Sequence, residues 1–88
     1  MSLKVGVLMG GDSDERIVSL STGNEVLKAF KKLGYDAEKI LINGNFEKFL
    51  EKLQKKDLIF NALHGGKGED GKIQQWMDEN NIKYTGSG

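Results

Sequence analysis

Apolar and polar residues alternate along this chain in blocks whose period changes from one block to the next. Short, nearly continuous apolar runs are typical of parallel strands covered on both faces, and apolar residues three and four positions apart are typical of amphipathic helices. The pattern predicts strands over residues 5–9, 36–42, 58–63 and 82–84, and helices from residue 14 or 15 to 33, over 46–53 and over 71–80. This alternation predicts an α/β fold, a three-layer αβα arrangement with a parallel, Rossmann-like sheet of about four strands.

Details of the pattern refine this picture. Gly23 lies on the apolar stripe of the first helix, where it would let the helix approach the sheet closely, and Gly34 is expected to end that helix. Residues 36–42 are less apolar at their start, which favours a place near the edge of the sheet, whereas residues 58–63 look the most buried. The charged residues of the second helix, Lys52 and Lys56 among them, are expected to form a solvated face.

Length and composition exclude several classes of protein. The 88 residues make one small domain, and 13 basic side chains balance 13 acidic ones, so no overall field attracts nucleic acid or an anionic membrane. No apolar run approaches the roughly 20 residues of a membrane span, and no hydrophobic segment of a signal peptide is present. The absence of cysteine excludes thiolate metal ligands and disulfides and favours a cytoplasmic location.

A glycine-rich, acidic loop, residues 10–16, follows the first predicted strand. Glycines between a strand and a helix often cradle phosphate, but three carboxylates here would repel a pyrophosphate, and no phosphate-loop lysine is present. Asp12 or Ser13 can cap the following helix, which stabilises it by about 1 kcal/mol. Capping does not need all three acids, and the one left over suits an ammonium group through a charge-assisted hydrogen bond.

A second polar loop, residues 63–71, follows the third predicted strand and holds the only histidine, His64. Its neighbours Gly65 and Gly66 leave the imidazole uncovered, and a pKa near 6.5 lets small environmental changes charge it. Beside the acidic first loop, His64 would complete a bipolar pocket for a zwitterion. A purely structural histidine, with Glu69 and Asp70 capping the third helix, is the alternative. One histidine and scattered acids lack metal-ligand spacing, so no metal site is predicted.

With both loops in view, the sequence resembles the N-terminal domain of the D-alanine–D-alanine ligases, which are ATP-grasp enzymes. The resemblance covers essentially the whole chain, in family order and spacing. Its segments are Val5-Gly6-Val7-Leu8-Met9-Gly10-Gly11-x-Ser13-x-Glu15-Arg16-x-Val18-Ser19, Phe60-Asn61-Ala62-Leu63-His64-Gly65-x-x-Gly68-Glu69-Asp70-Gly71-x-Ile73-Gln74 and Tyr84-Thr85-Gly86-Ser87-Gly88. Two positions depart from the family pattern: Ile17 replaces an acid and Gln75 replaces a glycine. Neither removes a residue assigned to substrate.

The resemblance implies a reaction of the cell-wall pathway that makes peptidoglycan. ATP would phosphorylate the carboxylate of a first D-alanine, and the amine of a second would attack the acyl phosphate, so that the dipeptide, ADP and phosphate leave. By family correspondence, the catalytic residues of this chain are Glu15, which orients the first ammonium group, and His64, which stabilises charge near the acyl phosphate. Both also bind substrate. The other residues that the resemblance assigns to the substrate pocket are Val18 at the methyl group, with Ser19, Gly10, Gly11 and Gly65 shaping its walls.

The resemblance also implies what lies outside the chain. Residues 1–84 would form the pre-ATP-grasp substrate domain, and residues 85–88 would begin a linker to central and C-terminal ATP-grasp domains. Those domains would hold ATP, Mg²⁺ and the second-substrate site, where D-alanine, D-lactate or D-serine is chosen. We therefore expect this chain to be catalytically silent alone. Ligases of this family commonly pair through their N-terminal domains, which implies a homodimer.

Two other interpretations remain open at this point. The Met9-Gly10-Gly11-Asp12-Ser13-Asp14 segment resembles the loop of purine-pathway carboxyaminoimidazole ribonucleotide mutases, although Gly11 stands where that loop has serine and no later segment matches. A stand-alone small-ligand or dimerisation module, with no chemistry of its own, also fits the length. The source gene beyond residue 88, and a comparison of the two ligands in a binding test, would separate these interpretations from the ligase.

Overall fold

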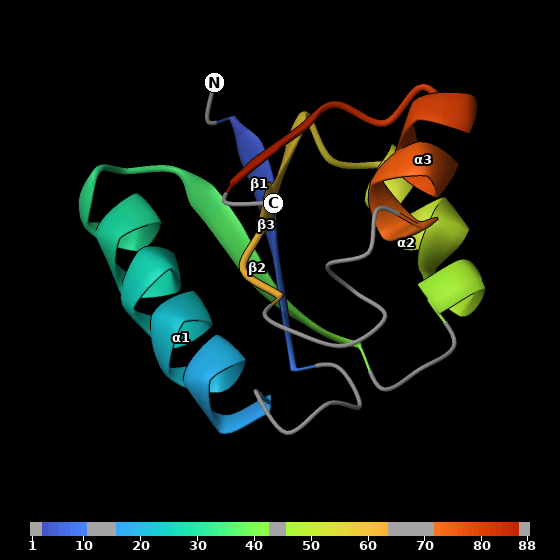
Figure 1. Cartoon of the computed structure of the whole chain (residues 1–88). Coiled ribbons are helices and arrows are strands. Elements are labelled where there is room, and N and C mark those ends of the chain that lie inside the picture. The colour runs from blue at the N-terminus through green and yellow to red at the C-terminus, as the bar shows by residue number, and fades with distance from the viewer. Residues whose placement is uncertain (1–2, 11–15, 43–45, 64–71, 87–88) are drawn as a thin grey trace.

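A computed structural model describes residues 3–10, 16–42, 46–63 and 72–86 of the chain. Its elements follow the predicted order, and Figure 1 shows them around one sheet. They are β1 (Lys4–Gly10), α1 (Arg16–Lys32), β2 (Asp36–Ile42), η1 (Phe46–Phe49), α2 (Leu50–Gln54), β3 (Leu58–Asn61), α3 (Lys72–Glu79) and β4 (Tyr84–Gly86). The prediction of an α/β chain of alternating strands and helices is therefore confirmed.

The four strands form one parallel sheet in the order β2-β1-β3-β4. β2 lies at an edge, as its polar start predicted. The prediction that residues 58–63 form the most buried strand is wrong: β1 is buried from Val5 to Gly10, whereas Leu58 and Phe60 of β3 are only partly buried. The reason is the position of α1, which packs against β1 and β2 and so leaves that face of β3 less covered.

Helices cover both faces of the sheet, which gives the three predicted layers (Figure 1). On one face, Val5, Val7 and Met9 of β1 pack under the apolar side of α1. On the other face, Leu8 of β1 joins a larger cluster that α2 and α3 complete. Alternate residues of β1 thus enter opposite cores, because successive side chains of a strand point to opposite faces.

Helices α1 and α3 both end in a left-handed residue. Gly34 has φ +93°, and the Tyr35 N–H donates to the Phe30 carbonyl at 3.1 Å, which confirms the predicted stop. At the end of α3, Asn81 takes φ 58° and the Ile82 N–H donates to the Met77 carbonyl at 2.9 Å. Both ends are Schellman motifs, in which a left-handed residue lets the next N–H reach back to a helix carbonyl.

The second motif explains why the last strand begins at Tyr84 and not at residue 82 as predicted. Ile82 is buried against Met77 and uses its N–H to close α3, so the chain becomes free to pair with β3 only after it. Thr85 and Gly86 pair with Phe60 and Asn61, so the strand extends into the segment that we expected to begin a linker. Within the described parts of the chain, no helix is both long and apolar enough to cross a membrane.

Candidate functional site

The carboxyl ends of the strands carry the two polar loops that the sequence singled out. In the sheet, β2 lies on one side of β1, and β3 and then β4 lie on the other side. The chain therefore proceeds in one direction from β1 to β2 and in the opposite direction from β3 to β4, and the switch point lies between β1 and β3. In open α/β sheets, ligands bind at such a switch point, just beyond the carboxyl ends. Residues 11–15 follow β1 and residues 64–71 follow β3, so both loops leave the sheet at this point.

The predicted site residues divide into two groups. Gly11, Glu15, His64 and Gly65 lie outside the described residues, so their predicted roles stay predictions. Gly10, Val18 and Ser19 are described, and they lie at the end of β1 and in the first turn of α1.

Ser19 is fully buried at the junction of α1, β1 and β3. Its hydroxyl accepts a hydrogen bond from the Gly10 N–H at 2.9 Å and donates one to the Ala62 carbonyl at 2.7 Å. One side chain of α1 therefore ties together the two strand ends from which the polar loops depart.

Arg16 makes a parallel connection from the same helical turn to the other side of β1. Its Nη1 donates to the Ile42 carbonyl at the end of β2, at 3.4 Å. Ile42 is the register partner of Gly10, and Gly10 has φ +101°. A side chain at position 10 would lie 2.9 Å from both Arg16 Nη1 and the Ile42 carbonyl oxygen, so glycine is required there for two reasons.

Val18 lies on a different side of the first turn from Ser19. It is 47% exposed, and its neighbour Ile17, which replaces an acid of the family pattern, is 79% exposed. Two apolar side chains thus face outward near the carboxyl edge, where they are available to a ligand or to another part of a larger protein. The predicted contact between Val18 and a substrate methyl group stays a prediction.

Asn61 is a functional candidate that the sequence reasoning missed. It is 2% exposed, and its Oδ1 accepts a hydrogen bond from the Leu63 N–H at 3.1 Å. This link from a side chain to the backbone two residues later is the hydrogen bond of an Asx turn, and it fixes the backbone at Leu63, the last described residue before His64. A lone amide side chain inside the apolar run Leu58–Leu63 was the available clue, because a buried polar residue must find a hydrogen-bond partner.

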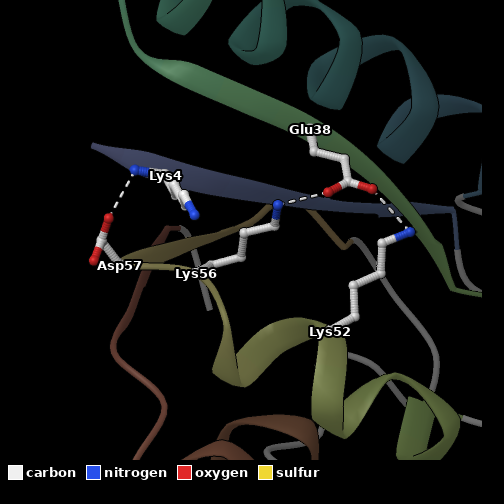
Figure 2. Close-up of polar contacts among 5 residues, drawn as sticks. All are labelled: Lys4, Glu38, Lys52, Lys56 and Asp57. Atoms are coloured by element: carbon white, nitrogen blue, oxygen red, sulfur yellow. Dashed lines mark hydrogen bonds and ion pairs between the residues drawn. The ribbon is translucent and has the colours of Figure 1, made fainter. Parts of the chain in front are cut away.

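The clearest ionic contacts lie away from this edge, toward the amino ends of the strands (Figure 2). Glu38 of β2 pairs with Lys52 Nζ at 2.9 Å and with Lys56 Nζ at 2.5 Å. Hydrogen bonds from Lys52, and then from Lys56, lower the pKa of Glu38 below its ordinary value of 4.5. The prediction of a solvated face is wrong for Lys56, whose side chain is only 13% exposed, because it crosses the bare backbone of Gly6 to reach Glu38.

The remaining titratable groups of the described residues do not indicate a further site. Burial, the charge of Asp78 and a hydrogen bond to it raise the pKa of Tyr84 above its ordinary value of 10.0. Among residues 3–10, 16–42, 46–63 and 72–86, no three His, Cys, Asp or Glu side chains gather to hold a metal ion. The described surroundings of the switch point are instead backbone groups, Arg16, Ser19 and apolar side chains.

Comparison with known proteins supports the assignment that the loops suggested. Residues 43–87, just over half of the chain, match the family described as D-ala D-ala ligase N-terminus. The chain belongs to this ligase family. A D-alanine–D-alanine ligase of Pseudothermotoga lettingae is 48% identical over 97% of the chain, and one of Pelotomaculum thermopropionicum is 50% identical over all of it.

The fold agrees with that membership. The crystal structure of the D-alanine–D-alanine ligase from Bacillus anthracis superimposes with a TM-score of 0.82 and 37% identity over 96% of the chain. The chain covers 27% of that structure, and 29% and 27% of the two curated relatives. It therefore spans less than a third of the length of the ligases that it resembles, and it corresponds to their N-terminal region.

Proposed function

We propose that this chain supplies part of the first D-alanine site of an ATP-dependent D-alanine–D-alanine ligase. The observation that carries the proposal is the family match over residues 43–87, which includes the His64 loop. The strand order supports it independently, because residues 11–15 and 64–71 both leave the sheet at its switch point. A zwitterionic amino acid needs one anionic and one hydrogen-bond-donating partner, and these two loops carry both.

In the proposed site, Glu15 accepts hydrogen bonds from the ammonium group of the first D-alanine. His64 donates to the substrate carboxylate and to the acyl phosphate formed from it, where negative charge develops. Gly10, Gly11 and Gly65 let the backbone approach the ligand, and Val18 contacts the methyl group. Ser19 shapes the pocket through the backbone, since its hydroxyl is hydrogen-bonded to the Gly10 N–H and the Ala62 carbonyl.

The remaining chemistry belongs, in this proposal, to ATP-grasp domains that follow residue 88 in the same protein. Bound there, ATP with Mg²⁺ supplies the phosphoryl group that activates the first carboxylate. The product dipeptide serves peptidoglycan synthesis, which places the enzyme in the cytoplasm, where ATP is available. The outward-facing side chain of Ile17 in α1, which the proposed D-alanine site does not use, is available to a second copy in the proposed homodimer.

The decisive experiment uses the source gene continued beyond residue 88. With the following ATP-grasp domains present, we expect ADP release that depends on D-alanine, and no turnover from the 88 residues alone. Glu15→Gln should lower kcat/KM for D-alanine by about 10- to 100-fold, the worth of a charge-assisted hydrogen bond. His64→Ala should lower kcat by about 100- to 1,000-fold.

Glu25→Gln is the matched control, because Glu25 is an exposed glutamate in the middle of α1, away from the first turn of that helix. Its activity should equal that of the unmodified protein. D-alanine-dependent turnover by the 88 residues alone would contradict the division of labour proposed here. ADP release indifferent to D-alanine in the longer protein would contradict the proposed substrate.

Binding to the 88-residue chain separates the ligase site from its rivals. In a titration followed by amide chemical shifts, D-alanine should perturb Gly10, Ala62 and Leu63, whereas aminoimidazole ribonucleotide should not. A preference for the ribonucleotide would favour the purine-pathway interpretation. Sedimentation over a range of concentrations tests the homodimer, and a monomer at high concentration would argue against it.

A further inference from the structure

The ladder between β1 and β3 ends in an unusual way. Its register pairs Leu8 with Asn61, and the Ala62 N–H donates to the Leu8 carbonyl at 3.0 Å. In a parallel ladder, bonds alternate in direction along the strands, so the next one would join the Gly10 N–H directly to the Ala62 carbonyl. In this chain, both of those groups bond instead to the hydroxyl of Ser19.

The serine oxygen therefore occupies the place of one backbone hydrogen bond. The Gly10 N–H lies 2.9 Å from Oγ, and Oγ lies 2.7 Å from the Ala62 oxygen, so two bonds in series span what one would otherwise span. A direct N–H···O bond brings nitrogen and oxygen to about 2.9 Å, which is too close for an oxygen atom between them. The Ser19 oxygen thus lies between the Gly10 N–H at the end of β1 and the Ala62 carbonyl just after β3, where a direct bond between them would leave no room for it.

The Ser19 hydroxyl cannot donate a second hydrogen bond. A serine hydroxyl has one proton to donate, and here the Ala62 carbonyl receives it. The side chain is fully buried, and Ala62 is 1% exposed, so water does not compete at this position. Arg16 anchors the same helical turn to Ile42 of β2, which holds α1 over the edge of the sheet.

We infer that Ser19 is a positioning residue, which keeps the sheet open at the switch point between β1 and β3 so that a small amino acid fits beyond it. This inference rests on the proposed function for the identity of the ligand, D-alanine. It assigns to Ser19 no contact with substrate; the residue acts through Gly10 and Ala62, the points from which the chain leaves the sheet toward Glu15 and His64. Without the hydroxyl, the two backbone groups are left to pair with each other, and the strand ends close.

A hydrogen-bond scalar coupling measures this directly. In uniformly ¹⁵N,¹³C-labelled protein, coupling between the amide nitrogen of Ala62 and the carbonyl carbon of Leu8 should be present, as the internal reference. Coupling between the amide nitrogen of Gly10 and the carbonyl carbon of Ala62 should be absent, and it should appear in Ser19→Ala. Gly10–Ala62 coupling in the unmodified protein would overturn the inference, whether or not any variant folds.

The functional consequence is measured in the longer protein with its ATP-grasp domains. Ser19→Ala should raise KM for the first D-alanine at least tenfold while KM for ATP stays within twofold, because only the D-alanine site is reshaped. In Ser19→Cys, KM for the first D-alanine should lie between those of the unmodified protein and Ser19→Ala, since a thiol fills similar space but forms weaker hydrogen bonds. Ser21→Ala is the matched control, an exposed serine on the same helix, and should change neither constant.

The positioning role would be overturned if Ser19→Ala raised KM for D-alanine and KM for ATP equally, or if it raised neither. If the unmodified protein fails to bind D-alanine at all, the proposed function fails. The coupling measurement then still decides, separately, whether Ser19 opens the sheet.

Discussion

Gly23 of α1 lies directly against Met9 of β1. A methyl group at position 23 would come within 2.6 Å of the Met9 Cβ and within 2.9 Å of its sulfur. The sequence predicted this close approach from the place of Gly23 on the apolar stripe, and the structure identifies Met9 as the partner. The contact sets how near the first turns of α1 stand to the carboxyl end of β1, where Ser19 and Gly10 meet.

Gly23→Ala should therefore destabilise the fold by about 1–3 kcal/mol, in spite of alanine's higher helix propensity, because the Met9 Cβ is attached to the backbone and cannot rotate away. Denaturant unfolding measures the change. Asn24→Ala, at the next and exposed position, gains propensity without a clash and should be neutral or slightly stabilising. A Gly23→Ala variant as stable as Asn24→Ala would show that α1 does not pack this closely.

Gly10→Ala and Gly34→Ala should differ in their cost. Both positions have positive φ, +101° and +93°, so alanine is strained at each by about 1–2 kcal/mol. At position 34 nothing lies within 4 Å of the added carbon, whereas at position 10 the Ile42 carbonyl oxygen lies at 2.9 Å. Gly10→Ala should lower the free energy of unfolding by more, and the reverse order would contradict the geometry at the carboxyl edge.

Asn81 offers a test of the α3 ending. Its φ of 58° is tolerated by asparagine and costs other side chains about 1–2 kcal/mol. Asn81→Ala should therefore destabilise the protein by about 1 kcal/mol, whereas Asn81→Gly should match or exceed the unmodified stability. Thermal unfolding of the two variants gives the comparison, and equal losses in both would mean that the asparagine side chain itself, and not its backbone conformation, matters.

Glu38 should make stability depend on pH in the acid range. Lys52 and Lys56 lower its pKa in the folded protein, so the folded state binds its proton less readily than the unfolded state does. The resulting stability is fully present above the ordinary value of 4.5 and is lost as pH falls through the lower folded pKa. Glu38→Gln should remove about 1 kcal/mol or less at pH 7, because Glu38 is 42% exposed.

The check on Glu38 is the gap in unfolding free energy between the unmodified protein and Glu38→Gln. That gap should be constant from pH 7 to about pH 5 and should shrink below it. Glu51→Gln, at an exposed glutamate of α2, serves as the control for a general loss of charge. A gap that is the same at pH 3 and pH 7 would mean that the ion pairs with Lys52 and Lys56 do not act on Glu38 in solution.

The order of elements and the layered fold were predictable because they depend on local periodicity. Residues 36–42 were bounded correctly, and Gly34 ended α1, since strand pairing and helix termination leave traces in consecutive residues. Asn81 ends α3 in a left-handed conformation as Gly34 ends α1, but it is not a glycine, which is the usual sign of such an ending. The start of β4 was predicted two residues early, because the apolar Ile82 serves the end of α3 and not the strand.

The sequence by itself determined the class of fold, the family resemblance and the two loops that carry Glu15 and His64. Only the tertiary structure decided that β1 is the buried central strand, that Lys56 crosses Gly6 to reach Glu38, and that Ser19 stands between Gly10 and Ala62. Each of these depends on which distant segment packs beside a residue. Ser19 and Ala62 lie 43 positions apart, and no periodicity records a partner at that distance.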